Sequence, residues 1–398
     1  MKTLNLPTEL PIFKEMIEEL DLPKHIEEKV NKRYESLSSW FNRENSTLKD
    51  VDIDIFAQGS FALGTTIKPI NENEEYDLDM GCKLNISNFK ALYSQEKLIE
   101  LVKNEIEAYR KANSIQNDVE EKRRCLRLVY KDEVAFHLDI VPCIPLNQEK
   151  ETEYRNVLLE NFSDQSLALD VAKYAVNISD NERYNFEDIS EDWHISNPQG
   201  YLRWFHERMN QQLSIVLEQR ATVEPIPFYN EKSVLQRCIQ LLKRHRDNMF
   251  FHPDQPQKAE GKPISIILTT LAAQAYSGEA TVEEAILNIL DNMPRLINTQ
   301  SPRIPNPVKP EEDFSDKWAD PQYASLNLEM NFTAWLIQAK RDFSDLIKSD
   351  NFGQVKTILT EGFNIAVEEA KLQQHYKYQS AVPKPIVIST PTAKPWCK

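Results

Sequence analysis

The sequence predicts an α+β protein of two lobes, in which a core of mixed sheet and helices precedes an almost wholly helical region. Apolar residues alternate at 51–55, 75–84, 124–130 and 134–142, and such alternation predicts half-buried β-strands. After about residue 230 they recur instead at three- and four-residue spacing, the pattern of amphipathic helices. At ~150 residues per domain, 398 residues give room for two or three domains.

Helices are expected on both sides of these strands. Residues 12–43 have helical periodicity, and Pro23 is suited to the start of a second segment. Further helices are predicted at 95–113, 200–219, 233–250, 263–277, 282–293 and 330–375. The four prolines within 302–310 predict an extended loop.

Four regions follow from these patterns. We expect an N-terminal helical brace at 1–50, a catalytic core at 51–215, a helical lobe at 216–375 and a tail at 376–398. The tail has four prolines, four lysines and no acidic residue, a composition typical of a mobile segment.

Composition restricts the class of function. The net charge of −15 disfavours a large nucleic-acid surface, which needs a basic face. The five cysteines are dispersed, with neither zinc-ligand spacing nor the pattern of a disulfide framework. No signal peptide and no apolar run of about 20 residues is evident. The sequence therefore predicts a cytoplasmic protein with reduced thiols and no membrane partner.

Glycine is scarce, with eight in the chain, yet three lie within residues 56–81. Gln58, Gly59 and Ser60 follow a predicted strand, and Gly64 comes after one turn of expected helix. Small residues let backbone N–H groups approach a phosphate, and the hydroxyl of Ser60 adds another donor. This segment is a candidate phosphate-binding turn.

Carboxylates lie on the strands that follow. Strand geometry puts Asp77 and Asp79 on one face, roughly 6.6 Å apart at ~3.3 Å per residue. Asp139 is the one acidic residue of an otherwise apolar strand, and His137 shares its face. Like charges this close favour a divalent cation between them, and oxygen ligands favour Mg²⁺ or Mn²⁺. Taken alone, the Asp-x-Asp pair also fits solvated strand ends, and His137 fits a residue that only packs or forms hydrogen bonds.

The order GSFALGT, YDLD and HLDIVP resembles the polymerase-β-like nucleotidyltransferases. LQRCIQLLKRHRD and KPISIILTTLAAQAY resemble the helical lobe of the bacterial cGAS/DncV-like members, or CD-NTases. These enzymes make cyclic oligonucleotide signals in antiphage (CBASS) defence. The resemblance covers about residues 10–375 and implies a bilobal fold with the active site between the lobes.

The resemblance implies roles for particular residues. The turn at 58–60 would hold the donor triphosphate, assisted by Lys243 and Ser265 of the helical lobe. Asp77, Asp79 and Asp139 would bind two Mg²⁺ ions, and Asp139 would also help to activate the attacking hydroxyl. The implied reaction makes a cyclic di- or trinucleotide from NTPs and releases pyrophosphate. A separate effector would receive the product, and an accessory regulatory protein is possible.

Two alternatives remain at this point. The core motif equally fits a transferase that adds a nucleotide to a protein, an RNA end or a small molecule. A non-catalytic nucleotide-binding scaffold is the other, although the three acids and the Gly-Ser pair are all present. The acidic charge and dispersed cysteines provide neither a basic DNA platform nor a zinc loop, so no DNA or RNA activator is expected.

Overall fold

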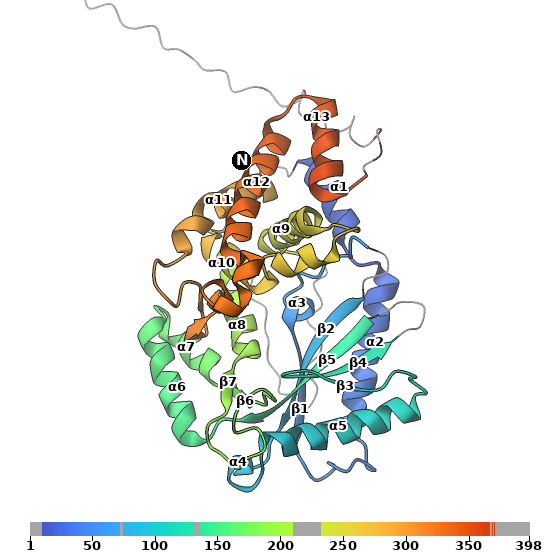
Figure 1. Cartoon of the computed structure of the whole chain (residues 1–398), viewed down its shortest axis with the longest axis vertical. Coiled ribbons are helices and arrows are strands. Elements are labelled where there is room, and N and C mark those ends of the chain that lie inside the picture. Colours follow the sequence, from blue (N-terminus) through green and yellow to red (C-terminus); the bar gives the residue numbers. More distant parts are fainter. Residues whose placement is uncertain are drawn as a thin grey trace, which may run out of the picture.

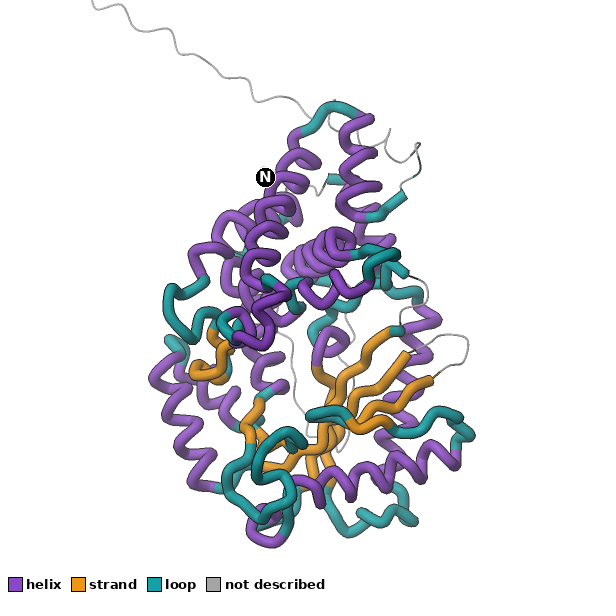
Figure 2. The backbone as a smooth tube through the Cα atoms, in the orientation of Figure 1, coloured by secondary structure: helices purple, strands orange, loops and turns teal. Residues whose placement is uncertain are grey.

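The computed structural model describes residues 10–71, 75–130, 136–209, 232–366, 368 and 370. The expected boundary at 215/216, residues 210–219 of the helix expected from 200, and the tail at 376–398 lie outside these residues. Figures 1 and 2 show the strands of the main sheet, with helices around them, in the lower half of the molecule, and an almost wholly helical upper half. The two-lobed α+β architecture predicted from the sequence is confirmed.

The main sheet has the order β1-β2-β5-β4-β3, with β6 beside β5 and β7 beside β6. Its strands are β1 Ile53–Gln58, β2 Tyr76–Leu84, β3 Glu120–Glu121, β4 Leu126–Tyr130, β5 Phe136–Pro145, β6 Val176–Ile178 and β7 His194–Ser196. β2 and β5 pair in parallel, while β1 and β4 flank them antiparallel. The parallel pair therefore lies at the centre of the sheet.

Some helices of the N-terminal half pack against the sheet, and others pack with the helical lobe. They are α1 Pro11–Leu20, α2 Lys24–Phe41, α3 Gly59–Ala62, α4 Phe89–Leu92, α5 Gln95–Ala112, α6 Gln148–Asn161, α7 Gln165–Ala172 and α8 Pro198–Met209. Leu78 and Met80 of β2 and Leu138 of β5 are buried in one cluster with α2 and α5. That face of the sheet is therefore closed, and alternation turns Asp77 and Asp79 to the other face.

The helical lobe contains the remaining α-helices of the described chain. They are α9 Val234–Phe250, α10 Ser265–Ala275, α11 Val282–Asn292, α12 Leu328–Lys348 and α13 Phe352–Thr357. Short helical turns span Pro256–Gly261, Met293–Leu296, Asp316–Trp318, Pro321–Leu326 and Ile358–Gly362. The proline-rich loop expected at 302–310 includes part of a two-stranded hairpin, β8 Pro305–Asn306 and β9 Lys309–Asp313.

The two helices of the expected N-terminal brace pack into different cores. Phe13 and Met16 of α1 are buried with the helices of the helical lobe, together with α6, α7 and α8. Val30 and Tyr34 of α2 are buried instead against the sheet and α5. Both ends of this segment are therefore anchored, one in each lobe.

Among the described residues, Cys82, Cys125, Cys143 and Cys238 form no disulfide bond. Within the described ranges, no helix is both long and apolar enough to cross a bilayer.

Candidate active site

Four neighbouring strands place two of the predicted acids, Asp79 and Asp139, in one row across the sheet. Gln58 of β1 pairs with Asp79 of β2, which pairs with Asp139 of β5, which pairs with Arg127 of β4. Two positions along the parallel pair, and so on the same face of the sheet, Asp77 lies opposite His137. The structure thus brings together the three predicted acids, although 60 residues of sequence separate Asp79 from Asp139.

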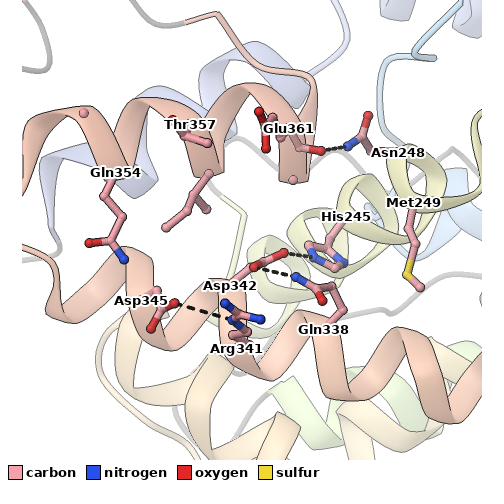
Figure 3. Close-up of a pocket in the computed structure, with 13 residues that line it drawn as sticks. His245, Asn248, Met249, Gln338, Arg341, Asp342, Asp345, Gln354, Thr357 and Glu361 are labelled. Carbon is pink, nitrogen blue, oxygen red and sulfur yellow. Dashed lines mark hydrogen bonds and ion pairs between the residues drawn. The ribbon is translucent and has the colours of Figure 1, made fainter.

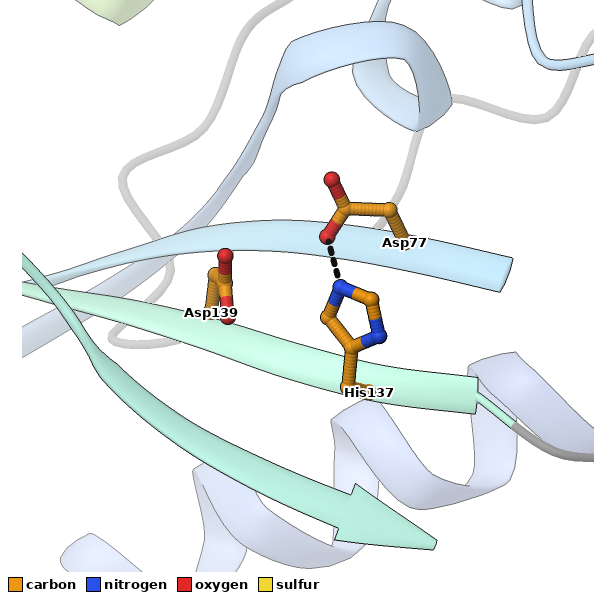
Figure 4. Close-up of side chains that lie close together, drawn as sticks. All are labelled: Asp77, His137 and Asp139. Atoms are coloured by element: carbon orange, nitrogen blue, oxygen red, sulfur yellow. Dashed lines mark ion pairs between the residues drawn. The ribbon is translucent and has the colours of Figure 1, made fainter. Parts of the chain in front are cut away.

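The carboxylates differ in their surroundings. Both oxygens of Asp139 accept hydrogen bonds from Arg127, from Nε and Nη2, each at 2.7 Å. Asp77 is about half exposed, and its Oδ1 lies 3.0 Å from Nε2 of His137 (Figure 4). Asp79 has neither partner; burial together with the charges of Asp77 and Asp139 raises its pKa to about 7. The negative charges of Asp139 and Asp77 therefore each have a nearby partner. The charged form of Asp79 has neither of these partners and is destabilised.

This arrangement fits a divalent cation. Ligand atoms of Asp77, His137 and Asp139 lie within 4.8 Å of one another, and Asp79 is the strand neighbour of Asp139. A cation would remove the repulsion that raises the pKa of Asp79. Carboxylate oxygens favour Mg²⁺ or Mn²⁺, and the residues present therefore fit the expected metal.

His137 connects two acids. Its Nδ1 lies 3.2 Å from Oε2 of Glu75, while its Nε2 contacts Asp77. Burial lowers the pKa of His137, but the hydrogen bond and charge of Asp77 outweigh burial and raise it above the ordinary value. With both nitrogens engaged, His137 is suited to orient Asp77 rather than to replace a ligand. The sequence indicated only that it shared the face of Asp139.

Gly59 closes over the carboxylate of Asp79. It has a φ of +65°, and a Cβ at this position would overlap Oδ2 of Asp79. A side chain here is therefore excluded both by the backbone conformation and by the neighbouring acid. The expected helical turn forms as α3, but it spans only four residues. Its helix dipole is consequently small, and the backbone N–H groups and the Ser60 hydroxyl are the candidate phosphate donors.

The two residues predicted in the helical lobe have different environments. Lys243 is 5% exposed, and its Nζ donates to the carbonyl and the hydroxyl of Thr65, each at 3.0 Å, just after α3. Ser265 is exposed at the first turn of α10, and its Oγ accepts from Nη1 of Arg246 at 3.0 Å. Lys243 thus contacts the segment after the phosphate-binding turn, whereas Ser265 is linked to α9.

A cavity of about 190 Å³ opens beside Gln58 and Gly59, between the core and the helical lobe. Its apolar lining includes Leu202, Ile266 and Phe314. Its polar lining includes Ser196, Asn306 and Glu312. The sequence indicates no role for the segment containing Glu312, because only the hairpin of β8 and β9 brings it to this cavity.

The carboxylate of Glu312 has a free edge. Nδ2 of Asn306 donates to its Oε2 at 2.8 Å, and its Oε1 lies 3.9 Å from Nε2 of His194. Burial and the charges of Lys309 and Arg124 lower the pKa of His194 to about 4, so this histidine is neutral near pH 7. No lysine or arginine of the described chain lies within ion-pair distance of Glu312. It can therefore accept hydrogen bonds from a ligand.

A larger cavity of about 680 Å³ lies in the helical lobe, between α9, α12 and the α13 region (Figure 3). His245 and Asp342 meet at 3.0 Å on its wall. None of the predicted site residues lines it. The smaller cavity, in contrast, is lined by Gln58 and Gly59, and it is therefore the candidate nucleotide pocket.

Comparison with known proteins gives one family. Residues 53–143 match the nucleotidyltransferase domain of cyclic GMP–AMP synthases of the DncV type. The chain is 31% identical over 370 residues to the c-di-GMP synthase of Roseivirga ehrenbergii, covering 90% of this chain and 85% of the relative. It is 24% identical over 323 residues to the cyclic dinucleotide synthase CdnG of Bradyrhizobium diazoefficiens, covering 78% and 70%.

Solved structures share the fold. The GTP complex of Bradyrhizobium diazoefficiens CdnG superposes with a TM-score of 0.60 at 19% identity, covering 93% of this chain and 98% of that one. Vibrio cholerae DncV with its linear intermediate pppA(3′,5′)pG gives 0.53 at 16% identity, covering 91% and 88%. Both lobes are therefore included in the structural match.

Proposed function

The chain belongs to the DncV-like nucleotidyltransferase family, and from that premise we propose that it joins two GTP molecules into a cyclic dinucleotide. A ribose hydroxyl of one nucleotide attacks the α-phosphorus of the other, the bond to the β-phosphate breaks, and pyrophosphate leaves. A second attack closes the ring. The product would act as a signal on a separate effector in antiphage defence, as the family resemblance implies.

The row of Asp79, Asp139 and Arg127 carries this proposal, together with Gly59 above it. Asp77, Asp79 and Asp139 would hold two Mg²⁺ ions, and the bound metal would supply positive charge for activation of the hydroxyl and departure of pyrophosphate. Ser60 and the backbone of the turn would donate to the triphosphate. Asp139 would accept the hydroxyl proton through a lone pair that Arg127 leaves free, because the guanidinium takes one hydrogen bond on each oxygen.

Glu312 supports guanine as the base. Guanine has two adjacent donors on its Watson–Crick edge, N1–H and the N2 amino group, which suit one carboxylate. Adenine has an acceptor beside its donor, and would place N1 against the negative charge. The apolar walls formed by Ile266 and Phe314 suit the faces of a flat ring. Asn306 holds the carboxylate in place from the other side.

The reaction is tested with purified protein and labelled NTPs. Protein, Mg²⁺ and each NTP or NTP pair are incubated, treated with phosphatase, and resolved by chromatography and mass spectrometry. We expect a phosphatase-resistant product with the mass of cyclic di-GMP, absent from Asp77→Asn and Asp79→Asn variants. Label transferred to a protein, an RNA end or a small molecule, with no cyclic product, would favour the alternative transferase.

Base choice has its own test. In Glu312→Gln, the amide offers one acceptor and one donor, the complement of adenine's edge. We expect the preference for GTP over ATP in kcat/KM to fall by about 10- to 100-fold, as one bidentate contact would give. Glu311→Gln removes the same charge from the exposed neighbour, which does not line this cavity, and should keep the preference. Equal behaviour of the two variants would reject Glu312 as the base-reading residue.

A further inference from the structure

The hydroxyl of Thr66 donates a hydrogen bond to Oγ of Ser60 at 3.0 Å. A serine hydroxyl has one proton to donate and two lone pairs that accept. Because Thr66 occupies one lone pair, the proton of Ser60 cannot be directed at Thr66. That proton is therefore left for another acceptor, at a half-buried position next to the exposed backbone of Gly59.

Helix α9 of the other lobe fixes the position of Thr66. Nε2 of Gln240 donates to the carbonyl of Thr66 at 2.8 Å, and Lys243 donates to Thr65. Two further side chains of α9 complete the set, Gln236 donating to the carbonyl of Leu63 and Arg244 to that of Lys68. The four donors have helical spacing on one face of α9. Through them, the helical lobe holds the whole segment that follows the phosphate-binding turn.

We propose that Thr66 is a positioning residue for the triphosphate: its hydroxyl orients that of Ser60, so that Ser60 donates to a phosphate oxygen. This inference rests on the proposed function, because it takes the ligand of Ser60 to be an NTP. A phosphate oxygen is charged and has no proton to give, so a serine whose proton points inward at Thr66 would bind it poorly. Thr66 acts through Ser60 and touches no substrate itself.

Binding of a non-hydrolysable GTP analogue with Mg²⁺ tests this, measured by calorimetry on the full chain. Thr66→Val keeps the shape of the side chain but removes the donor, and should weaken binding about 5- to 10-fold. Thr66→Ser keeps the hydroxyl and should bind within about twofold of the parent. Ser60→Ala should also weaken binding. In the Ser60→Ala background, Thr66→Val should cause no further loss, because the two act as one unit.

Two results would overturn the proposal: parental affinity in Thr66→Val, or an equal loss whether or not Ser60 is present. Should Thr66→Val fail to fold, Thr66→Ala deletes the same hydroxyl without a branched side chain, and the same outcomes apply. Binding is measured without turnover, so a parent protein that binds the analogue but forms no cyclic product counts against the proposed function alone. A parent that binds neither GTP nor ATP analogues overturns both.

Discussion

Arg127 and Asp139 form a bidentate ion pair, in which two 2.7 Å hydrogen bonds occupy both carboxylate oxygens. The side chain of Asp139 is 11% exposed and that of Arg127 is 29% exposed. In the absence of a metal, the guanidinium therefore supplies the positive charge that this buried acid needs. A metal ion at the proposed site would therefore compete with the guanidinium for these oxygens.

This competition predicts how an Arg127→Met variant behaves. Breaking a buried pair costs about 3–5 kcal/mol, and less where one partner is partly solvated, as Arg127 is. We expect the melting temperature to fall. Addition of Mg²⁺ should then raise the melting temperature of this variant by more than it raises that of the parent protein. Arg124→Met is the matched control, because Nε of Arg124 pairs with Asp180 instead. Thermal melts with and without MgCl₂ measure both; the same response to Mg²⁺ in both variants would contradict competition at Asp139.

Gly59→Ala should separate damage to the site from damage to the fold. The new Cβ would overlap the carboxylate of Asp79, and the alanine would have to adopt the positive φ of Gly59. Gly278→Ala also places alanine at a positive φ, 89°, in the connection between α10 and α11. Each should lose about 1–3 kcal/mol to backbone strain. Only Gly59→Ala should also lose activity, by about 100-fold for a displaced carboxylate. Initial rates beside unfolding curves decide, and retained activity in Gly59→Ala would show that Asp79 tolerates displacement.

Alternation in the sequence was sufficient to predict which face of each strand carries the acids. Asp77 and Asp79 do share a face, and His137 does share that of Asp139, because side chains alternate along any strand. Helix periodicity also placed α5 and α9 within one or two residues of their observed ends.

Register between strands was beyond the sequence. The pairing of Asp79 with Asp139 depends on a parallel contact between strands that are not consecutive, which no local pattern encodes. Arg127 therefore went unrecognised as the partner of Asp139, although it lies on a predicted strand. Glu312 was missed for a similar reason, since its hairpin reaches the cavity from a distant part of the chain.

Lys243 should make stability depend on pH. Burial, and next the charge of Arg246, lower its pKa from 10.5 to about 7. Between these two values the unfolded chain holds a proton that the folded protein has lost, so the unfolding free energy rises with pH. We expect this rise to be about 1–3 kcal/mol larger in the parent than in Lys243→Met between about pH 7 and 9. Urea denaturation at both pH values measures it, with Lys340→Met on α12 as an exposed control.

The same protonation predicts NTP affinity. A neutral Lys243 gives up its charge attraction to a triphosphate, so affinity should fall as pH rises above about 7. Lys243→Arg stays charged and should flatten this dependence. Calorimetric titration with a non-hydrolysable GTP analogue across this range is the measurement. If the affinity of Lys243→Arg depends on pH as steeply as that of the parent, another group causes the dependence.

His137→Asn should weaken the response to Mg²⁺ without removing any carboxylate. The imidazole lies between Glu75 and Asp77, and residues that orient a metal ligand typically contribute 10- to 100-fold in metal affinity or activity. We expect the Mg²⁺ concentration for half-maximal rate to rise by about this factor at fixed pH. Glu75→Gln leaves the contact between His137 and Asp77 in place and should cause a smaller change. If the asparagine variant follows the parental Mg²⁺ curve, the sheet backbone alone orients Asp77 and the imidazole only fills space.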